Sequence, residues 1–245
     1  MSRKTRRNHP PSPTAAPDDA ASGASSPLGR RGLLLLGLGA ALLLVLLAGV
    51  LLLRGESPGQ ATDGARQAAL LSENAPSLGD PSARVHIVEF LDPACETCAL
   101  FYPLGKRMLD AEPGRIRLSI RHVAFHEGSD YVVRLLEASR RQDLYWPTLE
   151  ALLASQATWA PHHTVRPELA REAIGGVGLD LARLEADMND PEVLRRVERD
   201  LADAKTLAVT KTPAYFVNGR PLPSFGAQQL FDLVSEELRR AYASP

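Results

Sequence analysis

Hydrophobic positions along the chain form one long uninterrupted run and a series of shorter, patterned segments. The long run covers 32–53, where Leu, Val, Ala and Gly stand without a charged residue. Further on, 84–91 is apolar and β-branched, as in a buried strand, and 96–110 has the spacing of a helix. A Pro-Gly turn at 113–114 leads to a second strand-like stretch over 116–125. This order predicts a β-α-β unit with two parallel strands and a right-handed crossover.

The pattern then changes to helical spacing, and strand character returns only near the end of the chain. Residues 130–205 have apolar positions at helical spacing throughout. Strand 214–217 is followed by Asn218-Gly219, the strongest short signal for a hairpin. An amphipathic helix is predicted over 227–242. The folded part is therefore expected to be α/β, in the order β-α-β, an all-helical insertion, then β-β-α.

The run 32–53 is long enough to cross a hydrocarbon core of about 30 Å at about 1.5 Å per residue. Several basic residues precede it, whereas Arg54-Gly55-Glu56 follow it, so the positive-inside rule places the N-terminus in the cytoplasm. A cleaved signal peptide is the competing interpretation. It would have an apolar region of about 7–15 residues ending at an A-x-A-like site, which this run lacks. We therefore expect an uncleaved transmembrane signal anchor, with everything after Arg54 on the far side of the membrane.

Composition sets the other boundaries. Residues 1–31 are rich in Pro, Ser, Ala and Arg, which predicts a disordered cytoplasmic tail. Residues 54–80 are expected to be a flexible linker with one short helical segment at 65–71. Residues 81–242 then form one domain of ordinary size, with the helical insertion at about 130–205. The net charge of -1, with acids and bases interspersed, predicts no nucleic-acid partner.

The chain has two cysteines, Cys95 and Cys98, at the start of the helix that follows the first strand. Unpaired N–H groups and the positive dipole end at a helix N-terminus favour a thiolate on the first of them. A zinc site needs four ligands, and the one tight histidine pair, His162-His163, is adjacent rather than spaced. A structural disulfide across so short a loop would remove little unfolded-chain entropy. The pattern therefore predicts a redox-active dithiol and no metal.

Further stretches match this interpretation. An acidic-aromatic pair at 89–90 precedes the Cys-Glu-Thr-Cys of 95–98, and Pro103 stands five residues after the second cysteine. The stretch 122–126 leads into the inserted helices, and 209–219 contains a Thr-Pro, a strand and Asn-Gly. Together these stretches resemble the DsbA-like thiol:disulfide oxidoreductases, which have a thioredoxin fold with a helical insertion. The resemblance extends over roughly 80 to 242.

The resemblance implies a role for each matched residue. Cys95 is the expected nucleophile and Cys98 the resolving thiol that attacks the mixed disulfide. Pro213 is the expected cis-proline, and the backbone of Thr212 is expected to pair with an extended substrate segment. Glu89 matches an acidic residue that lies near the buried cysteine and can carry protons. The alternative for Glu89 is an ordinary solvated strand residue.

The residues between the cysteines depart from the Pro-His of the strongly oxidising members. The Glu96 carboxylate disfavours a neighbouring thiolate, so Glu96 and Thr97 are candidates for tuning the redox potential. The direction of electron flow therefore stays open between a disulfide donor, which we favour, and a periplasmic reductase or isomerase. His122 and His126 lie in a matched stretch, but lone histidines are more often core or surface residues, and we leave them outside the catalytic set.

The activity expected from the resemblance is disulfide exchange with cysteine-containing extracytoplasmic proteins, without a metal or an organic cofactor. The expected location is the inner membrane of a bacterium, with the catalytic domain in the periplasm. Regeneration requires a redox partner, for which a membrane-embedded protein is one candidate. We expect a monomer, because residues 54–80 are too short and too polar for the dimerisation module that isomerases carry. An alternative of another class is a membrane-tethered protein that binds a soft metal ion such as Cu(I) on the two thiolates. No Met-rich or His-rich tract supports that alternative.

Overall fold

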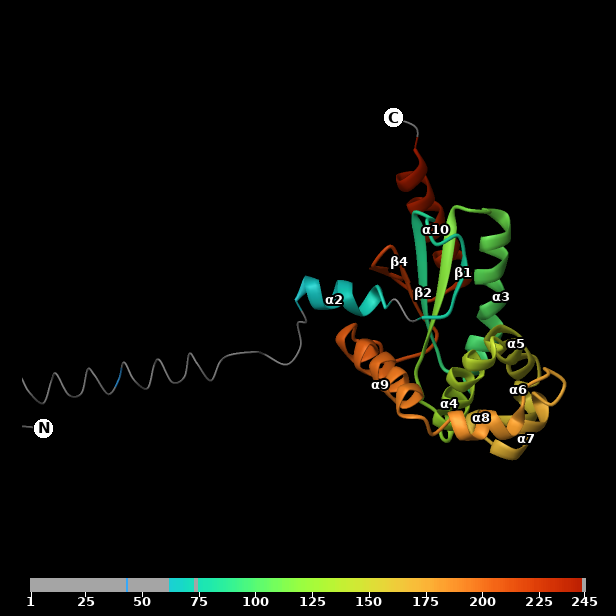
Figure 1. Cartoon of the computed structure of the whole chain (residues 1–245). Coiled ribbons are helices and arrows are strands. Elements are labelled where there is room, and N and C mark those ends of the chain that lie inside the picture. The colour runs from blue at the N-terminus through green and yellow to red at the C-terminus, as the bar shows by residue number, and fades with distance from the viewer. Residues whose placement is uncertain (1–42, 44–61, 73–74, 244–245) are drawn as a thin grey trace, which may run out of the picture. The chain divides into compact units, whose positions relative to one another are not determined.

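The structure, a computed structural model, describes residue 43 and residues 62–72 and 75–243. The elements below belong to one compact unit, 60–245 (Figure 1). The predicted tail at 1–31 lies outside the described residues, as does the predicted anchor at 32–53 apart from Leu43. Among the described residues, no helix has the length and apolar character needed to cross a membrane.

A mixed five-stranded sheet with the order β1-β3-β2-β4-β5 forms the centre of the unit. β2 and β3 run parallel, which confirms the predicted β-α-β unit, and the other neighbours pair antiparallel. The turn at Asn218-Gly219 joins β4 to β5 as the predicted hairpin, with positive φ at both residues. The strands are β1 (Ser77–Gly79), β2 (Val85–Leu91), β3 (Ile116–His122), β4 (Ala214–Val217) and β5 (Arg220–Pro221).

Helices cover both faces of the sheet and gather at the N-terminal end of α3 (Figure 1). α3 and α10 pack on one face, and α2 and α9 pack on the other. The segment predicted as an all-helical insertion contains α4 to α9 and no strand. The helices are α2 (Asp63–Leu70), α3 (Glu96–Ala111), α4 (Ser129–Ser139), η1 (Arg140–Gln142), α5 (Tyr145–Ala154), α6 (Gln156–Trp159), η2 (Pro161–His163), α7 (Pro167–Ala173), α8 (Leu181–Asp187), α9 (Pro191–Thr206) and α10 (Ala227–Tyr242).

Side chains of β2 alternate between these two layers. Ile87 and Leu91 join the core that includes residues of α3 and α10, whereas Val88 and Phe90 join the core that includes residues of α2 and α9. Because both faces are covered, the strand is an almost continuous apolar run. Glu89, between Val88 and Phe90, therefore projects with Ile87 and Leu91 into the core on the α3 side.

Part of the predicted linker at 54–80 is structured, which corrects that prediction. Thr62 caps α2 by accepting a hydrogen bond from the N–H of Ala65, and Ala69 and Leu70 are buried. β1 pairs with β3 at the edge of the sheet. A helix of eight residues and a strand of three bury few side chains. The short helical segment predicted at 65–71 corresponds to α2, whereas a strand of three residues is too short to give a recognisable pattern.

The strand predicted over 116–125 ends at His122. The N–H of Val123 still bonds to the carbonyl of Leu91 at 3.1 Å. The N–H groups of Phe125 and His126 then donate to the carboxylate of Asp92, at 2.6 and 3.0 Å. A side-chain acceptor thus takes the donors that a sheet would use, and the ladder stops.

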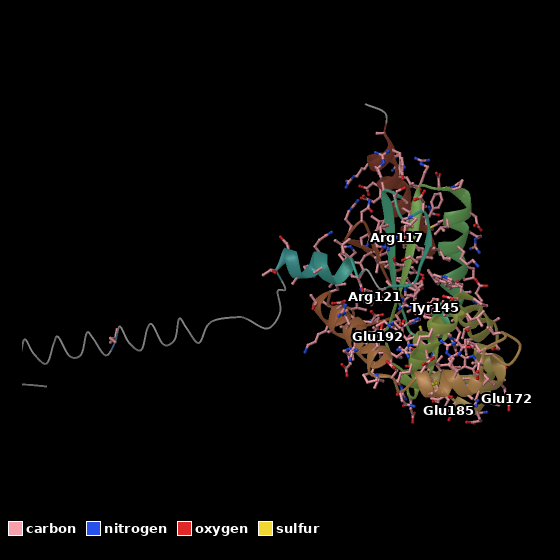
Figure 2. All side chains as sticks on the ribbon, in the orientation of Figure 1. Arg117, Arg121, Tyr145, Glu172, Glu185 and Glu192 are labelled. Carbon is pink, nitrogen blue, oxygen red and sulfur yellow. The ribbon has the colours of Figure 1, made fainter. Side chains whose placement is uncertain are left out.

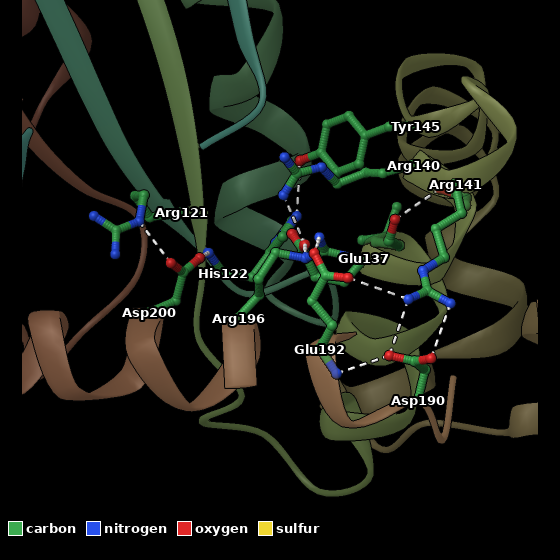
Figure 3. Close-up of polar contacts among 12 residues, drawn as sticks. Arg121, His122, Glu137, Arg140, Arg141, Tyr145, Asp190, Glu192, Arg196 and Asp200 are labelled. Carbon is green, nitrogen blue, oxygen red and sulfur yellow. Dashed lines mark hydrogen bonds and ion pairs between the residues drawn. The ribbon is translucent and has the colours of Figure 1, made fainter. Parts of the chain in front are cut away.

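Arg121 is a fully buried cation on the α9 side of the sheet (Figures 2 and 3). Its guanidinium donates to Asp200 at 2.7 Å, to Asp203 at 2.5 Å and to the carbonyl of Ala69 at 2.7 Å. A buried charge is tolerated only when it is paired and hydrogen-bonded, as here. Arg121 thereby fastens α2 and α9 to β3.

Candidate active site

Cys95 and Cys98 lie where β2 passes into α3. Cys95 is the N-cap residue, with extended backbone (φ -81°, ψ 115°), and Cys98 lies in the first turn. Both are free thiols. Cys95 is the more exposed of the two cysteines, at 5%, whereas Cys98 is fully buried, at 0%. This asymmetry suits an attacking thiol with a buried partner behind it.

The surroundings of Cys95 stabilise its thiolate. The thiol of Cys98 donates a hydrogen bond to it, and this outweighs the opposing effect of burial. Thr212 and the backbone N–H groups of Cys98 and Thr97 at the start of the helix act in the same direction. Together they lower the pKa of Cys95 from 9.0 to about 5. Burial raises the pKa of Cys98 far above its ordinary value, so at neutral pH the reduced pair carries its negative charge on Cys95.

The loop before β4 brings Thr212 and Pro213 against Cys95. The Thr212–Pro213 peptide bond is cis. Cys95 Sγ, as a thiol, donates to the backbone oxygen of Thr212 at 3.4 Å. A shallow cavity of about 260 Å³ borders Pro213, with Leu222 and Phe225 in its wall. The structure thus brings two distant parts of the chain, both singled out in the sequence, to the same sulfur.

Glu89 is fully buried on the α3 side of the sheet, so the alternative of a solvated strand residue is wrong. Among the described residues, neither of its carboxyl oxygens has a hydrogen-bond partner. The hydroxyl of Tyr215, directly opposite Glu89 on β4, also has none. Burial raises the pKa of Glu89 from 4.5 to about 8, and the charge of Cys95 adds to the rise. Glu89 is therefore mainly a neutral carboxylic acid at pH 7.

Glu96 and Thr97 occupy the first turn of α3 beside the thiolate. The side chain of Glu96 is exposed, so water and salt screen its repulsion of the thiolate. Thr97 is half-buried and contributes its backbone N–H to the stabilisation of Cys95. Their tuning of the redox potential stays a prediction.

Asp92 shapes the turn between β2 and Cys95, a function that the sequence analysis missed. Its carboxylate accepts from the N–H of Ala94 at 2.9 Å, and its carbonyl accepts from the N–H of Cys95 at 3.0 Å. The other carboxylate oxygen binds the imidazole of His126 at 2.8 Å. The Asp-Pro pair is a turn signal that indicates the local part of this arrangement. The contact with His126 is non-local and leaves no such signal.

The two histidines left outside the catalytic set have structural partners. His122 Nε2 lies 2.7 Å from the hydroxyl of Tyr145 (Figure 3). Burial lowers the pKa of His122 to about 4, so its ring is neutral at pH 7. His126 binds Asp92 and stacks on His163, with ring centroids 4.7 Å apart. Each ring thus supports the frame of the site.

Metal ligation at this site would begin from the two sulfurs of Cys95 and Cys98, which are soft ligands. Within residues 62–72 and 75–243, no group of three or more His, Cys, Asp or Glu side chains is arranged to hold a metal ion. The structure therefore adds no further protein ligand to the pair.

We expect the thiolate of Cys95 to form with a midpoint near pH 5. Its ultraviolet absorbance, followed in the reduced protein as pH is varied, measures this directly. Cys95→Ser should lack the transition, and Cys98→Ala should shift it to higher pH because the largest stabilising hydrogen bond is gone. A midpoint near the ordinary cysteine value of about 8.5 would contradict the stabilised thiolate.

Comparison with known proteins places this geometry in a family. A family model described as thioredoxin matches residues 71–232. Thiol:disulfide interchange protein DsbA of Bordetella parapertussis is 26% identical over 176 residues, 69% of this chain and 78% of that protein. The crystal structure of a thioredoxin-like oxidoreductase from Silicibacter pomeroyi has a TM-score of 0.61 and 29% identity, and the match covers 71% of this chain and 98% of that one.

A relative of another kind also matches part of this chain. The Na⁺/H⁺ antiporter NhaA of Herminiimonas arsenicoxydans is 30% identical over 162 residues, which is 66% of this chain and 25% of that protein. The chain thus spans about a quarter of the length of this antiporter. The family match covers more than half of the chain and includes both cysteines and the Thr-Pro loop. The chain therefore belongs to the thioredoxin family, and its relatives include proteins named thiol:disulfide interchange protein DsbA.

Proposed function

We propose that this chain exchanges disulfides with cysteine-containing proteins through Cys95 and Cys98 and acts mainly as a disulfide donor. The observation that carries the proposal is the stabilised thiolate of Cys95 in front of a fully buried Cys98. A dithiol is a stronger oxidant when its reduced form is more stable, and these stabilising hydrogen bonds act on the reduced form. The relationship to a protein named thiol:disulfide interchange protein DsbA supports the same activity.

The donor reaction proceeds in two exchanges. A substrate thiolate attacks Sγ of Cys95 in the oxidised pair, a substrate–Cys95 disulfide forms, and Cys98 leaves. The second substrate thiolate then attacks the substrate sulfur of this mixed disulfide, and Cys95 leaves as the thiolate. The substrate gains a disulfide and loses two electrons, which reduce the protein pair. A thiol of low pKa leaves faster, so the stabilised Cys95 thiolate favours this direction.

Glu89 is proposed to deliver the proton that Cys98 needs when it leaves. The Cys98 thiolate forms in an apolar core, where its high pKa makes it take up a proton. Glu89 is protonated at pH 7, and its charge influences the ionisation of Cys98. Transfer of the proton leaves a carboxylate, which regains a proton from solvent.

The backbone of Thr212 is proposed to pair with an extended segment of the substrate. The support is the distance of 3.4 Å between Cys95 Sγ and the Thr212 oxygen. A substrate whose cysteine reaches Cys95 must therefore run past the loop before β4. Main-chain pairing of this kind gives affinity without demanding one substrate sequence.

The proposed location is the periplasmic side of a bacterial inner membrane, with an uncleaved anchor at 32–53. The support is the length of this apolar run and the basic residues in front of it. Relatives named as Na⁺/H⁺ antiporters add support, because such transporters work in membranes.

An alkaline phosphatase fusion after Pro245 tests this topology. The fusion should be active and should sediment with membranes. The same fusion lacking residues 32–53 is the control, and it should be inactive and soluble. An inactive full-length fusion would contradict the orientation, and a soluble, shortened product would show cleavage.

The redox state of the pair in cells tests the direction of exchange. Rapid acid quenching followed by alkylation with a mass-shifting reagent separates the oxidised form from the reduced form. A disulfide donor should be mostly oxidised at steady state, because its partner keeps it ready to react. A mostly reduced pair would instead indicate a reductase or an isomerase.

Glu96→His should make the protein more oxidising. The change removes a carboxylate near the thiolate and adds a ring that can be positively charged. Exposed charges of this kind act weakly, so we expect a rise of roughly 20–40 mV. The wild-type potential should fall between about -120 and -270 mV, the DsbA and thioredoxin values.

Glutathione equilibria measure both potentials, and Glu96→Gln separates loss of the negative charge from gain of the ring. The glutamine variant should lie between the wild type and Glu96→His. A potential that is unchanged or lower in Glu96→His would contradict the electrostatic account.

A further inference from the structure

Side chains of the helical insertion contact three consecutive backbone carbonyls in front of α3. Gln156 Nε2 donates to the carbonyl of Pro93 at 2.6 Å and to the carbonyl of Cys95 at 3.0 Å. His163 Nδ1 lies 3.2 Å from the carbonyl of Ala94. Gln156 is 5% exposed and is the first residue of α6, far from the dithiol in sequence. The insertion therefore contacts each of the last three residues of the turn that presents the nucleophile.

The carbonyl of Cys95 also begins α3, because it accepts the N–H of Ala99 at 3.2 Å. Its orientation thus sets the direction in which the first turn of the helix leaves. Gln156 holds this carbonyl and that of Pro93 with a single nitrogen, so the peptide groups that follow Pro93 and Cys95 are fixed relative to each other. A buried carbonyl that loses its donor is left with its full desolvation penalty, which favours rearrangement of the turn.

We propose that Gln156 is a positioning residue for the nucleophile, an inference that rests on the proposed disulfide exchange. By holding the carbonyls of Pro93 and Cys95, it keeps Cys95 Sγ directed at the N–H groups of Thr97 and Cys98. Those groups stabilise the thiolate, so the contact made by the insertion contributes to the oxidising power of the pair. The insertion then helps to set the redox properties of the cysteine pair, in addition to any contact that it makes with substrates.

Gln156→Met tests this role, because methionine has a similar length and no donor. We expect the pKa of Cys95 to rise by about one unit, measured from thiolate absorbance. In glutathione equilibria the preference for the reduced form should fall about tenfold, which corresponds to a potential about 30 mV lower.

Gln142→Met is the matched control. Gln142 also lies in the insertion, and its amide exchanges two hydrogen bonds with the backbone of Asp180, at 3.1 and 2.9 Å. This variant loses the same kind of bond away from the active-site turn. It should lose stability in urea unfolding and leave the Cys95 pKa and the glutathione equilibrium unchanged.

Two results would overturn the proposal. One is a folded Gln156→Met protein with the wild-type pKa and equilibrium. The other is an equal change in both variants, which would indicate general loosening of the insertion. If Gln156→Met does not fold, Gln156→Asn keeps the amide on a side chain one carbon shorter, and it should shift both quantities in the same direction by less. An unshifted Asn variant would then count against the role.

The outcome is separable from the proposed direction of exchange. A wild-type pair that is found reduced in cells would remove the donor function. The Gln156→Met shift would still stand, because it is measured against the wild type in vitro.

Discussion

Cys98→Ala is expected to accumulate mixed disulfides with other proteins, and Cys95→Ala to accumulate none. Exchange in either direction passes through a disulfide on Cys95, the partly exposed sulfur with the stabilised thiolate. Only Cys98, held beside it in the first turn of α3, can release that adduct from within the protein. An intramolecular thiol acts at a very high effective concentration, so its loss should slow release on the order of 10³-fold or more.

Non-reducing gels of alkylated cell extracts, probed for this chain, show the adducts directly. Cys98→Ala also removes the hydrogen bond that most lowers the pKa of Cys95, so purified proteins are best compared near pH 8, where more thiolate forms. The double variant Cys95→Ala/Cys98→Ala is the control for unrelated crosslinks. Equal trapping by Cys95→Ala would contradict the roles assigned to the two cysteines.

The parts of this fold that the sequence predicts are those with long or local signals. The apolar strand at β2, the hairpin at Asn218-Gly219 and the amphipathic helix α10 each carry a pattern within one segment. The dithiol and the Thr-Pro loop are local motifs of the same kind, and the fold brings them to 3.4 Å from each other. Their meeting is a consequence of the predicted β-α-β and β-β-α units sharing one sheet.

The parts that the sequence does not predict depend on distant partners. The sequence indicates the helical segment of α2 but not its packing, which depends on Arg121, a residue of β3 whose burial no local pattern reveals. Gln156 stands in a short helix, and its contact with the turn before α3 joins positions about sixty residues apart. Glu89 is ambiguous for a different reason: β2 has both faces covered, so alternation offers no polar side against which a buried acid stands out.

The stability of the reduced protein should respond to pH in opposite ways through Glu89 and Cys95. The pKa of Glu89 is raised from 4.5 to about 8, chiefly by burial, so the folded state holds this proton more tightly than the unfolded state. Its contribution is fully present below pH 4.5 and is lost as pH rises through 8. A difference of this size corresponds to about 5 kcal/mol at about 1.4 kcal/mol per pH unit.

Cys95 changes the stability of the reduced protein with pH in the opposite direction. Its pKa is lowered from 9.0 to about 5, chiefly by the hydrogen bond from Cys98, so the folded state releases this proton more readily. Its contribution is present above pH 9 and is lost as pH falls through 5. After allowance for screening by solvent, this amounts to on the order of 3–5 kcal/mol. Between pH 5 and 8 the pH dependences of the two contributions therefore nearly cancel, and the stability of the reduced wild type changes little with pH.

Two variants should separate these contributions in urea unfolding of the reduced protein at a series of pH values. In Glu89→Gln the free energy of unfolding should rise by several kcal/mol as the pH increases from 5 to 8, because only the Cys95 contribution remains. In Cys95→Ser the free energy of unfolding should fall by a similar amount over the same pH range, because burial still raises the pKa of Glu89. Parallel pH profiles for the two variants would contradict the assignment of opposite signs.

The oxidised wild type provides a control that needs no substitution. Its disulfide removes the Cys95 thiolate while Glu89 stays buried, so its stability should fall with rising pH as in Cys95→Ser. The difference in stability between the reduced and oxidised forms is linked to the redox potential, because reduction and unfolding form one thermodynamic cycle. The unfolding curves and the glutathione equilibria must therefore give the same pH dependence. Agreement would assign the oxidising power of this domain to the stabilised thiolate of Cys95, and a potential with no matching pH dependence would rule that assignment out.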